Sequence, residues 1–180
     1  GWQRIAKVEG NQSISFGHQV TYKPNDKITL NSSSFIGNDK TKNEKRMRYF
    51  HDLYGSFQLT DQFSALLGLD VGAEQKLKGS EQYNIWYSPN VQMKYQFDNK
   101  WALAGRLEYY NDKNGVIIST GTPNGFQTFG YSLNVDYAIF KNVVFRTEAR
   151  GFTSKDAIFV KNDGLKQGNF FITTSLAAWF

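Results

Sequence analysis

Charged residues recur at every second position in several segments of this chain, the spacing that places side chains on one face of a strand. Guanidinium and carboxylate groups on one face pair across neighbouring strands, or attract and repel ions that pass them. Consecutive predicted strands carry six of these residues, here called the charge ladder: Arg106, Glu108, Asp136, Arg146, Glu148 and Arg150. The polar faces of other predicted strands carry four more: Asp52, Asp70, Glu74 and Lys94.

Two interpretations of the charge ladder stay open at this point. A charge that faced lipid would cost about 2–4 kcal/mol at the bilayer midplane, so in a membrane barrel these side chains must point inward. In a wide lumen they would line an aqueous path and set its ion preference. In a barrel of ten strands, side chains largely fill the lumen, and we favour a plug whose acids and bases satisfy each other. With twelve strands or more, the channel becomes the favoured interpretation.

Catalytic and metal-binding patterns are not evident. The sequence has no Cys, which excludes disulfides, thiolate metal sites and Cys nucleophiles. Alternation puts His18 and His51 on an apolar face, and His51 and Asp52 point to opposite faces, so they cannot form a dyad. The segment from Asp112 begins like a calcium loop but lacks a closing acidic residue. We predict no enzyme activity, no catalytic residue, no metal and no cofactor.

The elements that must position the ladder are strands with one apolar and one polar face. Period-2 alternation predicts nine of them, at 13–23, 28–36, 47–59, 63–74, 83–97, 101–110, 128–139, 143–151 and 169–180. Residues 1–8 form a weaker candidate for a tenth strand. A soluble sandwich can show the same alternation, so the faces alone do not identify the architecture.

Connections between the predicted strands alternate strictly between short and long. Short turns fall at 24–27, 60–62, 98–100 and 141–142, and long polar loops lie between them. An aromatic residue stands beside each short turn, as in the interfacial girdle of a membrane barrel. Short periplasmic turns and long outer loops are typical of up-and-down outer-membrane barrels. We therefore expect the turns in the periplasm and the loops outside.

The last strand resembles the C-terminal strand of Gram-negative outer-membrane barrels, which ends in Phe after alternating apolar residues. The resemblance implies that this strand is the signal read by the barrel-insertion machinery. Its apolar face is about as long as a bilayer core is thick, and the residues of the predicted signal are Phe170, Ile172, Leu176 and Phe180.

Composition agrees with a strand-rich membrane protein of one domain, residues 1–180. Aromatics make up 16% of the 180 residues, with three Pro. The mean hydropathy of −0.51 does not contradict a membrane barrel, because only alternate residues need to be apolar. The net charge is +5. Because the basic residues cluster between strands, we expect outer-membrane lipid and lipopolysaccharide as partners and not nucleic acid. The basic loop 39–48 could bind lipopolysaccharide phosphates or a partner protein, and we favour the alternative that it is merely solvated.

Three stretches, 22–39, 95–116 and 143–159, resemble the putative OmpL-like β-barrel porins of Gram-negative bacteria. In that family a strand with Arg-x-Glu precedes a loop beginning Asn-Asp-Lys-x-Gly, and a later strand carries Arg-x-Glu-x-Arg. Here these are Arg106/Glu108, 111–115, and Arg146/Glu148/Arg150. The family is longer at its N-terminus, so the chain is expected to be either a complete barrel or the C-terminal part of one.

These observations predict an all-β fold, a transmembrane up-and-down antiparallel β-barrel of about ten strands or the C-terminal part of a barrel of twelve or more. The expected location is the bacterial outer membrane. The expected function is a porin-like channel for small polar solutes or ions. The alternative is a non-conducting structural or accessory subunit that binds other outer-membrane proteins.

Overall fold

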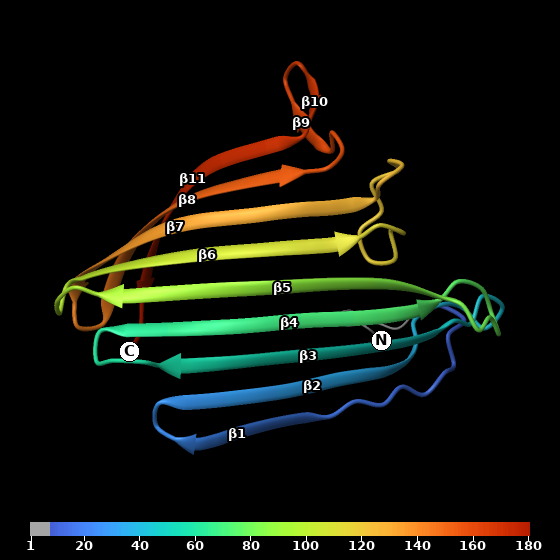
Figure 1. Cartoon of the computed structure of the whole chain (residues 1–180), viewed down its shortest axis with the longest axis horizontal. Helices are drawn as coiled ribbons and strands as arrows, with labels where there is room; N and C mark the ends of the chain where they lie inside the picture. The colour runs from blue at the N-terminus through green and yellow to red at the C-terminus, as the bar shows by residue number, and fades with distance from the viewer. Residues whose placement is uncertain (1–7) are drawn as a thin grey trace.

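A computed structural model of the chain describes residues 8–180 and consists of strands, turns and loops. The described residues form a nine-stranded antiparallel sheet in which every strand pairs with its neighbours in sequence order. Its strands are β1 (Gln19–Asn25), β2 (Ile28–Asn38), β3 (Met47–Gln58), β4 (Phe63–Gln75), β5 (Tyr83–Gln96), β6 (Trp101–Asp112), β7 (Phe126–Phe140), β8 (Val143–Ser154) and β11 (Gly168–Ala178). A separate hairpin of β9 (Phe159–Lys161) and β10 (Gly164–Lys166) rises from the loop between β8 and β11 (Figure 1).

The nine predicted strands are confirmed. Eight of them shift by three residues or fewer at either end, whereas the first, predicted at 13–23, begins at Gln19. The weak candidate at residues 1–8 falls almost wholly outside the described residues. Strands β1 and β11 are the two edges of the sheet, and both run toward the end with the short turns (Figure 1). If these two edges paired directly, they would pair in parallel. Strands of outer-membrane barrels are antiparallel, and β1 and β11 are not paired with each other in this structure.

The two ends of the sheet differ in the way the sequence predicts. Short turns gather at one end together with the C-terminus, and the long loops gather at the other (Figure 1). In the turn between β5 and β6, Asp98 Oδ1 accepts the backbone N–H groups of Lys100 at 2.7 Å and Trp101 at 2.8 Å. These bonds, with that of Lys100 the larger, lower the pKa of the Asp98 carboxyl, and they fix a reversal of only a few residues.

The apolar side chains lie on the outer, convex face of the sheet instead of in a core. Among the described residues only Trp86 and Ala102 are buried hydrophobics, while large ones such as Leu133 and Ile172 are more than half exposed. The accessible surface of 11908 Å² exceeds the value of about 8,900 Å² expected for a soluble monomer of this mass. This arrangement requires an apolar surrounding for the outer face. No helix in the described part of the chain is long and apolar enough to cross a membrane.

Two aspartates order parts of the long loops by accepting hydrogen bonds from loop N–H groups. The Asp112 carboxylate, with no exposed surface, accepts the backbone N–H groups of Val116, Ile117 and Ile118 at 2.7–2.9 Å. The loop start that resembles a calcium site is therefore a turn closed by hydrogen bonds. Asp156 in the last loop accepts the side-chain and backbone N–H groups of Asn124 at 2.8 and 2.9 Å. These contacts, the side-chain bond first, lower the pKa of Asp156 and tie two loops together.

Candidate functional site

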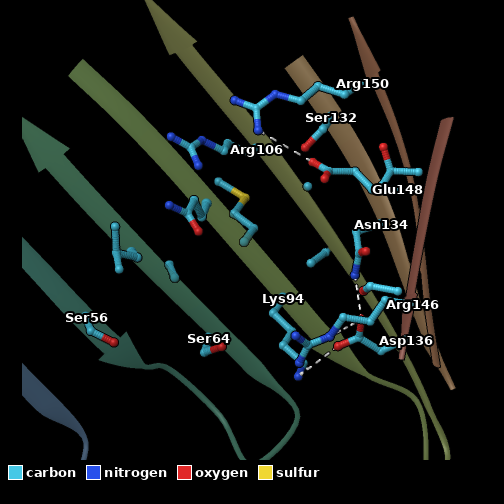
Figure 2. A pocket seen from close by; sticks show the side chains of 18 residues that line it. Ser56, Ser64, Lys94, Arg106, Ser132, Asn134, Asp136, Arg146, Glu148 and Arg150 are labelled. Carbon is cyan, nitrogen blue, oxygen red and sulfur yellow. Dashed lines mark hydrogen bonds and ion pairs between the residues drawn. The ribbon is translucent and has the colours of Figure 1, made fainter. Parts of the chain in front are cut away.

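A cavity of about 550 Å³ lies on the concave face of the sheet, toward the end with the short turns. Its lining comes from β3 through β8 and from β11. Polar side chains such as Ser56, Gln92 and Thr173 share it with the charge ladder. Five of the six ladder residues line it (Figure 2). The sixth, Glu108, pairs with two of them, Arg106 and Arg150. The sheet therefore brings the six predicted residues together on one face.

The lower cluster, Lys94, Asp136 and Arg146, is organised around one carboxylate. Asp136 Oδ1 lies 3.2 Å from Arg146 Nε on the neighbouring strand β8, and Asp136 Oδ2 lies 3.6 Å from Lys94 Nζ on β5 (Figure 2). Asn134 Nδ2 donates a further bond to Asp136 at 2.6 Å. Alternation had placed Lys94 on an inner face but apart from the ladder, and the structure adds it.

Lys94 reaches Asp136 across the intervening strand β6 because the side chains of β6 between them are small. The register puts Ala104 opposite Lys94 and Ala102 opposite Asp136. A four-carbon stem can lie over two methyl groups and bring its ammonium to the carboxylate. The two alanines at alternate positions are the sequence signal that could have revealed this contact.

The upper cluster, Arg106, Glu108, Glu148 and Arg150, is also organised around one carboxylate. Glu108 Oε2 accepts from Arg106 at 2.5 Å, and Glu108 Oε1 accepts from Arg150, two strands away on β8. Glu148 lies 4.0 Å from Arg150. Gly130 on β7 leaves the space for the bond between Glu108 and Arg150, since a Cβ there would lie 2.7 Å from Glu108 Oε1.

Asp136 in the lower cluster and Glu108 in the upper one lie deeper than the bases they pair with, whereas Glu148 is more exposed than Arg150, at 32% against 24%. The side chains of Asp136 and Glu108 are 13% and 17% exposed, whereas those of Lys94, Arg106 and Arg146 are 45%, 37% and 48% exposed. Four basic residues face three acidic ones in the two clusters together. The lower cluster consequently presents mainly its bases to the cavity, with the Asp136 carboxylate beneath them, while in the upper cluster Glu148 lines the cavity beside Arg106 and Arg150.

A separate pair of charges is buried at the end with the long loops. Arg48 and Glu74 are 3% and 2% exposed and are bonded by Nε and Nη2 at 2.9 and 2.5 Å, with Asp39 3.6 Å from Arg48. The Trp86 ring packs against the Arg48 guanidinium at 5.7 Å and over Gly72, where a Cβ would collide with it. Arg48, the last residue of the basic loop 39–48, is therefore neither solvated nor available to lipopolysaccharide, because it lies on the inner face beside Glu74.

Two of the other predicted inward residues, Asp52 and Asp70, lie opposite each other on β3 and β4. Asn31 donates to Asp52 at 3.2 Å. Neither carboxylate reaches the ladder in the described structure, and both stand on strands outside the two clusters.

The two histidines lie together on the outer face. Ser34 Oγ is 2.7 Å from His18 Nδ1, and Ser32 Oγ is 3.2 Å from the Nε2 atoms of both His18 and His51. His51 points away from the side of the sheet that carries Asp52, as alternation predicts. Within residues 8–180 no three His, Asp or Glu side chains are grouped so that they could hold a metal ion.

Three residues of the predicted insertion signal, Phe170, Ile172 and Leu176, are exposed on the outer face of β11, and the fourth, Phe180, is exposed two residues beyond its end. Their reading by the insertion machinery stays a prediction.

A family model described as putative beta-barrel porin-2, OmpL-like, matches residues 1–180. The chain belongs to this family of β-barrel porins. A search of curated proteins finds no match. One similar solved structure is titled "NanC porin structure in rhombohedral crystal form", with a TM-score of 0.61, 12% identity, 93% of this chain covered and 79% of that one. The OmpL-like family and the shared porin fold establish an all-β outer-membrane barrel of the porin type, and they point to a channel rather than an enzyme.

Proposed function

We propose that the chain conducts small polar solutes or ions through its lumen, with the charge ladder and Lys94 as the constriction, and that it prefers anions. The observation that carries the proposal is the unequal depth of the charges. The cations of Lys94 and Arg146 are nearly half exposed to the cavity, while the carboxylate of Asp136 between them is mostly covered. A passing ion meets the ammonium and guanidinium groups first.

Physical arguments support this preference for anions. Rings of Arg or Lys side chains favour anions in pores, and rings of Asp or Glu favour cations. The two clusters together hold four bases and three acids, so one positive charge is left unbalanced beside the cavity. The ion pairs fix the bases in place, and in the lower cluster the bases are the more exposed groups.

Planar bilayers with a salt gradient test the proposal. The wild-type protein should give discrete conductance steps with a reversal potential on the anion side. Arg146→Ala with Arg150→Ala should move that potential toward cations, whereas Lys155→Ala with Lys161→Ala, in the last outer loop, should leave it unchanged. A wild-type channel that selects cations, or a reversal potential that both double variants move equally, would contradict the proposed constriction.

A second candidate function is a non-conducting barrel that serves as a subunit of a larger outer-membrane complex. The observation that favours it is the cluster of His18, Ser32, Ser34 and His51 on the outer face. Polar groups that face lipid are costly, and a partner protein would cover them. A silent protein in the bilayer that copurifies with other outer-membrane proteins would support this function.

A further inference from the structure

A second pocket, of about 790 Å³, opens on the outer face at the end of the sheet with the long loops. It lies between the loop that follows β2, the loop that follows β4 and the segment that precedes β1. One side of it is basic and the other apolar. The basic side chains are Lys42, Lys45 and Lys78, and the apolar ones are Ile14, Phe16, Ile36 and Met47.

The three ammonium groups are available to a ligand. All three lysines are exposed, and in the part of the chain that the structure describes none of them forms an ion pair. Lys78 Nζ lies 3.5 Å from the backbone oxygen of Lys42, so one loop reaches the other. No carboxylate lines the pocket. Glu44 stands between Lys42 and Lys45 in the loop but does not line the pocket. Three cations that line one pocket attract an anion.

The apolar side continues the membrane face of the sheet. Ile14, Phe16 and Ile36 are 77%, 70% and 43% exposed. Phe16 and Ile36 are partners in an antiparallel bridge, with both N–H to O distances at 2.8 Å, so their side chains lie next to each other. Side chains of this kind belong against hydrocarbon and not against water.

A free inorganic anion would use only the basic half of this pocket. An amphiphile with a phosphate headgroup would use both halves, because its acyl chain can lie along the bridge while its phosphate meets the lysines. The long loops of outer-membrane barrels face the cell exterior, so the lipid in question is one of the outer leaflet.

We propose that this pocket binds a phosphorylated glycolipid of the outer leaflet, with its phosphate held by Lys42, Lys45 and Lys78 and an acyl chain along Ile14, Phe16 and Ile36. The site is separate from the lumen and does not depend on conduction. Of the basic loop 39–48, Lys42 and Lys45 take part, and the buried Arg48 does not.

Binding to the folded protein in mild detergent tests the proposal, with native mass spectrometry of added lipid A as the readout. Lys42→Ala, Lys45→Ala and Lys78→Ala together should weaken lipid A binding about 100-fold, since each basic side chain contributes to the attraction of a lipid phosphate. The control combines Lys155→Ala, Lys161→Ala and Lys166→Ala in the last outer loop, and it should bind like the wild type. The triple Arg variant at positions 42, 45 and 78 keeps the charges and should retain binding.

Two comparisons separate the possible sources of the phosphate. Lipid A from which the phosphates have been removed should bind the wild type as weakly as lipid A binds the triple Ala variant. Inorganic phosphate at the same concentration should not compete. Equal binding of both lipids, equal loss in both Ala triples, or displacement by inorganic phosphate would overturn the proposal. An unboiled gel, on which folded barrels migrate anomalously, shows that each variant is folded.

Discussion

The upper cluster depends on Gly130, although this residue carries no charge. Its missing side chain leaves the space through which Glu108 and Arg150 meet over β7. Alternation in the sequence predicts that both charged residues face inward. It cannot predict that they pair with each other across β7, because that contact depends on which inner positions of β7 carry small residues.

At this position we predict that Gly130→Ala lowers stability by about 1–3 kcal/mol, the usual cost of overpacking. The added methyl would lie 2.7 Å from Glu108 Oε1 and 3.1 Å from the Phe152 ring. Urea unfolding of the protein in lipid vesicles measures the change. Gly105→Ala is the matched control, since its Cβ would meet only the Ser132 backbone oxygen at 3.9 Å. Equal stability of the two variants would show that the space over β7 is not required.

At the scale of elements, strands β3, β4 and β5 are joined at their loop ends by Arg48, Glu74 and Trp86. The sequence predicts strands there, and it predicts Glu74 on the inner face. Arg48 falls in both the predicted basic loop 39–48 and the predicted strand 47–59, so the sequence leaves its place open. The register decides the matter by placing Arg48 opposite Glu74.

Glu74→Ala should destabilise the fold by about 3–5 kcal/mol, because removal of one partner leaves a buried charge with poorer compensation. Urea unfolding in vesicles again gives the value. The control is Asp163→Ala in the β9–β10 hairpin, where the ion pair with Lys166 at 2.7 Å is exposed. Loss of an exposed pair should change stability by less than about 1 kcal/mol. A small effect at Glu74, similar to that at Asp163, would mean that Asp39 alone suffices for Arg48.

At the scale of the whole molecule, the alternation of faces and of connection lengths predicted the main sheet but not the β9–β10 hairpin in the last loop. Nine strands, their order and the outward apolar face all follow from period 2 and from the position of turns such as Asp98–Lys100. The curvature of the sheet does not follow, because local patterns specify which face a residue takes but not how far the sheet bends. The sequence therefore predicts which side chains face the lumen, but not which of them contact each other.

The orientation in the membrane is the prediction that belongs to this scale. Because the chain has no native Cys, single cysteines can be introduced and labelled on intact cells with an impermeant reagent. Positions in the long loops should react, and positions in the short turns should react only after the outer membrane is opened. The loop positions are Lys42, Lys78, Gly121 and Lys161, and the turn positions are Asp26, Asp61, Asn99 and Asn142. The reverse pattern of labelling would invert the assignment.

The contacts that span two strands have a mechanical consequence. The bond from Lys94 to Asp136 and the bond from Glu108 to Arg150 each cross the concave side of an arc of three strands, like a chord. If the sheet flattened, the side chains on that side would move apart and both chords would break. The reach of one lysine and one arginine thus limits the radius of the arc, so the groups that would meet a solute also act as braces for the wall around it.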